Sequence, residues 1–272
     1  MQLEGPLLLV GGGKMGGALL DGWLARGISA GDVIVVEPAE AGRTALAAKG
    51  VRAVADASEL SGSPAPSVIV LAVKPQVMDA VVPPYARFAA AGSVFLSVAA
   101  GRTLGFFAQH LGASAAVVRT IPNTPAAVGR GMTVLCANSN VDAAARKVCD
   151  ELMRGVGETG WVEDEALIDA ATAVGGSGPA YVFYMIECMA NAGIAAGLPE
   201  DLARRIARQT VCGAGELAWQ SEEPPEQLRK NVTSPGGTTA AALDVLMAED
   251  GLQPLVEKAV DAAVKRSREL AG

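Results

Sequence analysis

The stretch 231–239 near the end of the chain, Asn-Val-Thr-Ser-Pro-Gly-Gly-Thr-Thr, combines residues that can bind an anion. Gly236 and Gly237 lack a Cβ, so a ligand can approach their backbone N–H groups closely. Hydroxyl groups that can cap the following helix or bind a ligand come from Ser234, Thr238 and Thr239. The unpaired N–H groups and the dipole at a helix start favour negative charge. Because no Gly-Lys-Thr follows, as a phosphate loop would require, the pattern favours a small carboxylate. A capped turn without a ligand is the alternative.

A second ligand-binding pattern, Gly-x-Gly-x-x-Gly, lies at the other end of the chain. It follows an apolar run at 7–10 and leads into helical periodicity at 18–25. Gly11 permits a tight turn, Gly13 lets a pyrophosphate approach, and Gly16 lets the helix pack closely. This order of strand, glycines and helix is typical of a dinucleotide site. The predicted cofactor contacts here are Val10, Gly11, Gly12, Gly13, Lys14, Met15 and Gly16.

Two charged residues after the second predicted strand, 32–36, bear on the choice of nicotinamide cofactor. Glu37 comes about 20 residues after the glycines, where a carboxylate often holds the ribose 2′-hydroxyl of NADH. Arg43 lies just beyond and could instead hold the 2′-phosphate of NADPH. The sequence therefore leaves NADPH and NADH open.

Three more apolar runs, 68–73, 93–98 and 115–120, predict further buried strands. Ligands of such sheets bind at the carboxyl ends of the strands. Asn123, between two prolines, could hydrogen-bond a nicotinamide or a substrate, or form an Asx-type turn. Further predicted cofactor contacts at these strand ends are Ala72, Val73, Lys74, Pro75, Ala99, Ala100 and Asn123.

The alternation of strands and helices over 1–162 predicts a doubly wound parallel sheet, a Rossmann domain. Residues 163–272 predict a second, all-helical domain, with one helix over 240–270. The longest uncharged apolar region, 170–186, contains glycines and a proline. We therefore expect a subunit interface there rather than a membrane helix.

Composition limits the possible functions. The 272-residue chain has a net charge of −7 and no basic stripe, which argues against a nucleic-acid partner. The four cysteines lack metal-ligand spacing, and no basic run precedes an apolar segment around Glu4, so we expect free thiols, no metal and a cytoplasmic protein. The single histidine, His110, argues against histidine-based catalysis. Hydride transfer from a positioned nicotinamide remains.

Five stretches, taken together, resemble pyrroline-5-carboxylate reductase over essentially the whole chain. They are Gly11–Gly16, Ala72–Gln76, Arg119–Pro125, Thr172–Ala180 and Val232–Thr239. The resemblance implies reduction of 1-pyrroline-5-carboxylate to L-proline with NAD(P)H, the last step of proline biosynthesis. It also implies that the helical domain, 163–272, serves substrate binding and dimerisation. The expected assembly is a homodimer, or an assembly of dimers, in which both chains contribute to each active site.

The resemblance assigns roles in the last loop. Ser234 and the N–H groups of Gly236 and Gly237 would hold the substrate carboxylate, and Val232 would form a wall of the pocket. Thr239 would be catalytic, with its hydroxyl meeting the ring nitrogen. Glu37 departs from the family pattern, since many relatives have a small or polar residue there.

Two other classes of protein fit less well. A β-hydroxyacid dehydrogenase shares the glycine pattern but would place a catalytic lysine on the first long helix of the second domain, and 167–196 contains no lysine. A non-catalytic nicotinamide sensor would not need an intact loop at 234–239.

Overall fold

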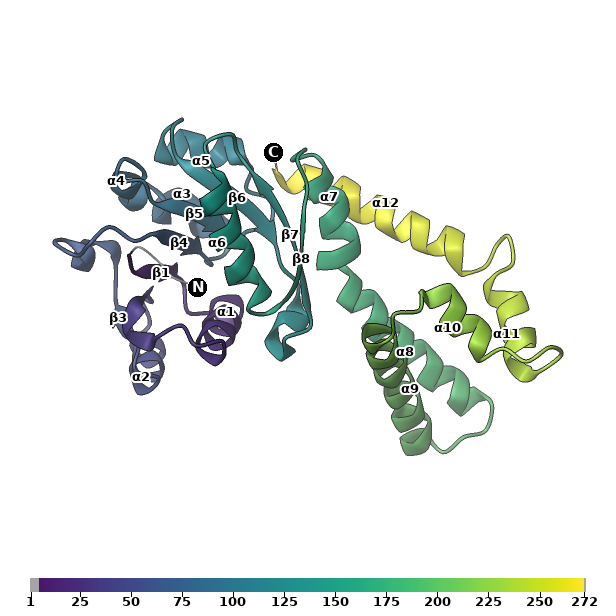
Figure 1. Cartoon of the computed structure of the whole chain (residues 1–272). Helices are drawn as coiled ribbons and strands as arrows, with labels where there is room; N and C mark the ends of the chain where they lie inside the picture. Colours follow the sequence, from purple (N-terminus) through teal and green to yellow (C-terminus); the bar gives the residue numbers. More distant parts are fainter. Residues whose placement is uncertain (1–4, 272) are drawn as a thin grey trace. The chain divides into compact units, whose positions relative to one another are not determined.

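The computed structural model describes residues 5–271, which form two compact units (Figure 1). Unit 1 contains residues 5–176 and 264–271, and unit 2 contains Ser177–Ala263. Glu4 lies outside the described residues. No helix in the described range is long and apolar enough to cross a membrane.

Eight strands of the described chain form one sheet in unit 1, in the order β3-β2-β1-β4-β5-β6-β7-β8. The strands are β1 (Leu7–Val10), β2 (Val33–Val36), β3 (Arg52–Val54), β4 (Val68–Leu71), β5 (Val94–Ser97), β6 (Ala116–Ile121), β7 (Gly131–Ala137) and β8 (Gly157–Trp161). The chain leaves β1 towards β2 on one side and returns to β4 on the other. This reversal puts a ligand-binding crevice at the carboxyl ends of β1 and β4.

The sheet is parallel apart from one pair, which confirms the predicted fold class with one correction. β7 runs antiparallel to β6, and β8 runs parallel to β7. Only residues 122–130 join β6 to β7, and they contain a 3₁₀ turn, η5 (Thr124–Val128), instead of a long helix. A parallel crossover needs a dozen or more residues, so this short connection reverses the chain.

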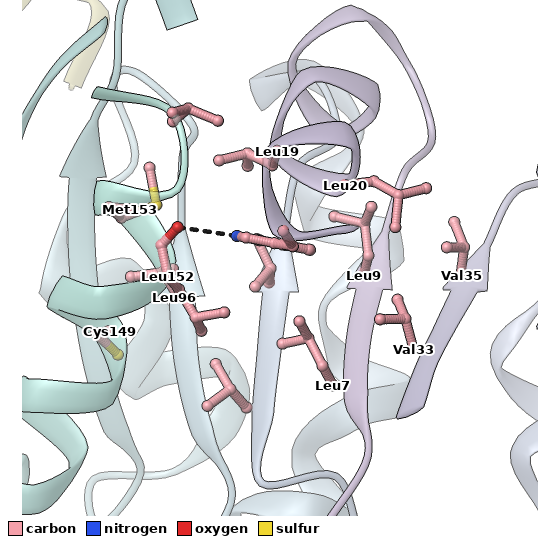
Figure 2. Close-up of a cluster of buried hydrophobic side chains, with 14 of the residues drawn as sticks. Leu7, Leu9, Leu19, Leu20, Val33, Val35, Leu96, Cys149, Leu152 and Met153 are labelled. Atoms are coloured by element: carbon pink, nitrogen blue, oxygen red, sulfur yellow. Dashed lines mark hydrogen bonds between the residues drawn. The ribbon is translucent and has the colours of Figure 1, made fainter. Parts of the chain in front are cut away.

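Helices cover both faces of the sheet because the central strands are apolar on both sides. They are α1 (Lys14–Ala25), α2 (Glu40–Ala48), α3 (Met78–Val81), α4 (Ala86–Ala89), α5 (Leu104–Leu111) and α6 (Ala143–Arg154). One core cluster packs Leu7 and Leu9 of β1 against α1 and α6 (Figure 2). In it, the Trp23 indole N–H donates to the Leu152 carbonyl oxygen at 2.9 Å. Alternate residues of β1 face a second cluster with α3–α5.

After β8 the chain is helical. The helices are α7 (Leu167–Ala171), a π turn η6 (Thr172–Gly176), α8 (Gly178–Ala195), α9 (Glu200–Gln220), α10 (Pro225–Asn231), α11 (Thr238–Leu246) and α12 (Leu252–Ala271). α8 turns into α9 at Gly197, whose φ of +99° suits glycine. The division at residue 162 follows the end of β8, and as a functional boundary it stays a prediction.

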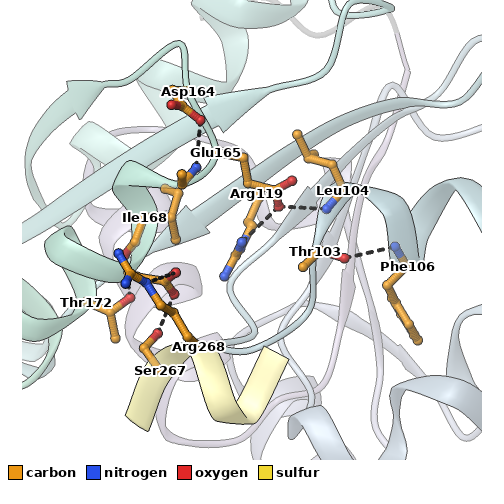
Figure 3. A network of polar contacts seen from close by, with 12 residues as sticks. Thr103, Leu104, Phe106, Arg119, Asp164, Glu165, Ile168, Thr172, Ser267 and Arg268 are labelled. Atoms are coloured by element: carbon orange, nitrogen blue, oxygen red, sulfur yellow. Dashed lines mark hydrogen bonds and ion pairs between the residues drawn. The ribbon is translucent and has the colours of Figure 1, made fainter. Parts of the chain in front are cut away.

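The single helix expected over 240–270 is wrong. α11 ends at Leu246, and α12 begins at Leu252. A Cβ on Gly251 would lie 2.5 Å from the Leu246 carbonyl oxygen, so the chain folds back on itself where only glycine fits. The last residues of α12 belong to unit 1, where the Ser267 hydroxyl donates to Asp169 at 2.6 Å (Figure 3).

Candidate active site

The glycine loop between β1 and α1 has the geometry that a dinucleotide needs. Gly11 has a φ of +101°, and a Cβ there would lie 2.8 Å from the Ala72 carbonyl oxygen. A Cβ on Gly16 would lie 2.0 Å from the Gly11 carbonyl oxygen. A Cβ on Gly13 would meet nothing within 4 Å. The loop is therefore closely packed at its ends and open at Gly13.

α1 begins directly after this open position. Gly13 is its N-cap and supplies no capping side chain, so the first N–H groups of the helix are not capped by it. The remaining predicted contacts, Lys14 and Met15, lie in that first turn, and Gly12 precedes it. The backbone N–H groups of these residues and the dipole of α1 suit a bound pyrophosphate.

Glu37 and Arg43 lie around the turn between β2 and α2, and both side chains contact backbone. Glu37 accepts from the Gly12 N–H at 2.9 Å through Oε2 and from the Ala39 N–H at 3.0 Å through Oε1. Arg43 Nη1 donates to the carbonyl oxygens of Glu37 and Pro38 at 3.0 and 2.5 Å. The carboxylate thus reaches back to the glycine loop, while the guanidinium folds onto the turn.

The ends of β4 and β5 carry the next group of predicted contacts. The Ala72 N–H donates to the Val10 carbonyl oxygen at 2.8 Å, which extends the pairing of β1 and β4 to the crevice. Val73 and Lys74 follow, and Pro75 begins the 3₁₀ turn η3 (Pro75–Val77). Ala99 is buried, and Ala100 next to it is exposed.

Asn123 has structural partners on both sides of its amide. Its Nδ2 donates to the Gly175 carbonyl oxygen at 3.0 Å, and its Oδ1 accepts from the Met132 N–H at 2.9 Å. These bonds tie the loop after β6 to β7 and to the π turn. One N–H and one lone pair stay free for a ligand, so the predicted cofactor contact stays a prediction.

An ion pair that the sequence did not reveal fixes the neighbouring loops. Arg119 of β6 is 3% exposed, and its Nη1 donates to Glu165 Oε1 at 2.8 Å. The Leu104 N–H donates to the same carboxylate oxygen at 2.8 Å (Figure 3). An arginine inside an apolar strand run was the available signal, because a buried charge needs a partner.

The loop at 231–239 lies in unit 2 and leads into α11. Gly236 has a φ of +68°, and a Cβ there would meet nothing within 4 Å. Gly237 is the N-cap of α11 and supplies no side-chain cap. Exposed side chains around it are those of Val232, Ser234 and Thr238, whereas Thr239 is half-buried.

The hydrogen bonds of this loop change the expected role of the Gly237 N–H group. Thr233 Oγ1 donates to the Arg229 carbonyl oxygen at 2.6 Å, which fixes the loop to α10. The Gly237 N–H donates to the Ser234 carbonyl oxygen at 3.0 Å, so this donor already has a partner. The first-turn N–H groups of α11 and the N–H of Gly236 are therefore better placed to bind a carboxylate.

Other titratable groups do not add a second site. Burial raises the pKa of the Cys149 thiol to about 12, and burial also raises the pKa of Cys136. His110 lies in the last turn of α5, as expected for a helix-end residue. Within the described range, no group of three His, Cys, Asp or Glu side chains could hold a metal ion.

Comparison with known proteins supports both parts of the chain. A family model described as pyrroline-5-carboxylate reductase dimerisation matches residues 165–270, and one described as NADP oxidoreductase coenzyme F420-dependent matches 7–101. The pyrroline-5-carboxylate reductase of Pseudomonas aeruginosa is 39% identical over 97% of this chain and 96% of that protein. The chain belongs to the pyrroline-5-carboxylate reductase family. The pyrroline-5-carboxylate reductase of Pisum sativum is 36% identical over 96% of this chain and 94% of that protein.

Solved structures of reductases in this family extend the likeness to the fold. The one from Coxiella burnetii has a TM-score of 0.93 and 34% identity, and covers 98% of this chain and 99% of its own. The Plasmodium falciparum reductase, solved with NADP bound, has a TM-score of 0.81 and 29% identity over 99% of both chains. The resemblance and the predicted NAD(P)H-binding Rossmann domain are confirmed, while the roles of single residues stay predictions.

Proposed function

We propose that this chain reduces the C=N bond of 1-pyrroline-5-carboxylate to L-proline, with NADPH or NADH as the hydride donor. The observation that carries the proposal is the loop before α11. Gly236 is open on its Cβ side, and α11 begins without a side-chain cap. A small carboxylate would find backbone donors there with little steric hindrance.

In this proposal, Ser234, Gly236, Gly237 and Thr238 surround the carboxylate. Ser234 and Thr238 are exposed and make no cap to α11, so their hydroxyl groups are available to donate. Gly237 contributes by keeping space clear, since its N–H already donates to Ser234. Val232, which is 64% exposed, supplies an apolar wall for the ring carbons.

The cofactor supplies the hydride, and this chain binds and orients it. The glycine loop and the first turn of α1 hold the pyrophosphate. The ends of β4, β5 and β6, with Ala72–Pro75, Ala99, Ala100 and Asn123, line the path towards the nicotinamide. The hydride goes to the imine carbon and a proton to the imine nitrogen, which gives the secondary amine of proline.

Thr239 is the proposed catalytic residue. It lies in the first turn of α11 and is half-buried. A threonine hydroxyl is too weak an acid to protonate the ring by itself. It hydrogen-bonds the ring nitrogen and orients it, and the proton that the nitrogen gains comes from water.

The helical unit is proposed to form a homodimer, or dimers that assemble further, with both chains contributing to each site. Large apolar side chains of α8 are exposed, among them Phe183 at 58% and Tyr184 at 66%. α9 adds Leu202, Ile206 and Leu217. Exposed apolar residues in this number mark an interaction surface. A cytoplasmic location is part of the proposal, supported by four free cysteines.

The test is a coupled measurement of cofactor oxidation and product. The purified chain is mixed with 1-pyrroline-5-carboxylate and NADPH or NADH, the loss of reduced nicotinamide is followed by absorbance, and proline is identified by chromatography. Thr239→Ser serves as a matched variant that keeps a hydroxyl. Cofactor binding without proline formation, with NADPH and with NADH, would rule out the proposed reaction.

A further inference from the structure

The carboxylate of Glu37 is fixed by its surroundings at the end of β2. Its two oxygens accept from the N–H groups of Gly12 and Ala39, at 2.9 and 3.0 Å. Its methylene stem occupies space beside α2, where a Cβ on Gly42 would lie 2.7 Å from Glu37 Cγ. A glycine inside a helix is destabilising, so α2 loses some stability at a position that leaves room for this side chain.

The fixed carboxylate has unused acceptor capacity on both oxygens. A carboxylate offers about four lone-pair sites and no donor when it is ionised. One N–H on each oxygen leaves a further acceptor site on each. Two hydroxyl donors on adjacent carbons, as in the ribose of an adenosine, match this pair of acceptors. A 2′-phosphate has only acceptor oxygens and about −1.5 to −2 charges, so it would face repulsion here.

Arg43 is held at the turn itself through one end of its guanidinium. Nη1 donates to the carbonyl oxygens of Glu37 and Pro38. Within the turn, Pro38 has no N–H and the Ala39 N–H is taken by Glu37, so neither residue offers a backbone donor to a phosphate. Glu40 adds a second carboxylate in the first turn of α2.

We propose that Glu37 makes this chain select NADH over NADPH, and that Arg43 stabilises the turn instead of binding a 2′-phosphate. The inference rests on the proposed cofactor site at the glycine loop. Two like charges held close together at this half-buried position cost enough free energy for a ratio of the NADPH Kd to the NADH Kd of at least about tenfold. The selection belongs to binding and does not require turnover.

The experiment measures binding alone. The full-length protein is titrated with NADH and with NADPH, without substrate, by calorimetry, and Kd is compared. Wild type is expected to bind NADH at least about tenfold more tightly. Glu37→Gln keeps the shape and an acceptor oxygen but removes the charge, so the ratio of the NADPH Kd to the NADH Kd should fall by about tenfold. Arg43→Ala should lower Tm and leave the ratio unchanged.

A second variant guards against loss of folding in Glu37→Gln. Gly42→Ala favours the helix but places a Cβ against the Glu37 stem. Displacement of the carboxylate should weaken NADH binding several-fold while NADPH binding changes less, and a thermal melt shows that the variant is folded.

Several outcomes would overturn the inference. They are NADPH binding as tight as NADH binding in wild type, a Glu37→Gln ratio equal to that of wild type, and a selective loss of NADPH binding in Arg43→Ala. Binding of neither nucleotide would overturn the cofactor site together with this inference. Tight NADH binding without proline formation would reject only the proposed reaction.

Discussion

Gly13 offers the sharpest test of the cofactor site, because the structure separates binding from folding at this position. A Cβ on Gly13 would meet nothing within 4 Å, and its φ of −67° and ψ of −164° are accessible to alanine. Gly13→Ala should therefore fold. The new methyl group would occupy the space into which a pyrophosphate approaches.

The expected magnitudes differ for the two properties. Alanine is a poorer N-cap than glycine, at a cost of about 0.5–1 kcal/mol, which lowers Tm by roughly 2–4 °C at most for a chain of this size. Loss of close backbone approach should raise the Kd of the nicotinamide cofactor by about 10- to 100-fold, or ~1.4–2.8 kcal/mol. Calorimetric titration and a thermal melt measure the two effects.

Two neighbouring glycines supply matched controls. A Cβ on Gly17 would lie 3.8 Å from the Gly12 carbonyl oxygen, an ordinary contact, so Gly17→Ala should bind cofactor normally and gain up to about 1 kcal/mol of stability. A Cβ on Gly16 would lie 2.0 Å from the Gly11 carbonyl oxygen, so Gly16→Ala should lose about 1–3 kcal/mol. Normal cofactor affinity in a folded Gly13→Ala protein would refute the reasoning.

Substitutions at three further positions test other parts of the chain. Thr239→Ala should lower kcat by about 10²-fold or more with little change in cofactor Kd, and Thr239→Ser should recover most of the rate; an unchanged kcat would remove the hydroxyl from the mechanism. Gly237→Val should raise KM for the carboxylate substrate by about 10-fold or more by narrowing the loop, and a normal KM would make the loop an ordinary turn. Cys149 has a folded-state pKa of about 12 against 9.0 for the free thiol, so its stabilising contribution is complete below pH 9 and is lost as pH rises towards 12. Denaturant melts of Cys149→Ala should accordingly lose less stability between pH 8 and 11 than wild type, and equal losses would contradict the burial argument.

Elements with a strong local pattern could be predicted from the sequence. β1, β2, β4 and β5 are short apolar runs that are wholly buried, and the first of them leads into a glycine motif with one established use. The local pattern alone specifies such strands, because a run of this kind has to be covered on both faces. The family resemblance rests on motifs that keep their order along the whole chain.

Features that depend on distant partners could not be predicted in this way. β7 contains glycine, threonine and cysteine and has alternating burial, so its strand character depends on pairing with β6 and β8. The break between α11 and α12 depends on the close approach of Gly251 to Leu246.

The partners of single site residues could not be predicted from the sequence either. Glu37 and Asn123 were expected to meet a ligand, and they also hydrogen-bond Gly12 and Gly175, which lie 25 and 52 residues away in the sequence. No local pattern contains that information.

The last helix has a consequence for how the protein is made. Asp169 of α7 accepts from Ser267 at 2.6 Å and lies 3.8 Å from Arg268, so unit 1 includes residues that are synthesised well after its sheet. A nascent chain on the ribosome can pair its strands early, but Asp169 lacks its Ser267 partner until 98 further residues have been synthesised. Early stop codons that remove only the final turns of α12 should therefore yield a reductase whose N-terminal unit is impaired, although every strand of its sheet is present.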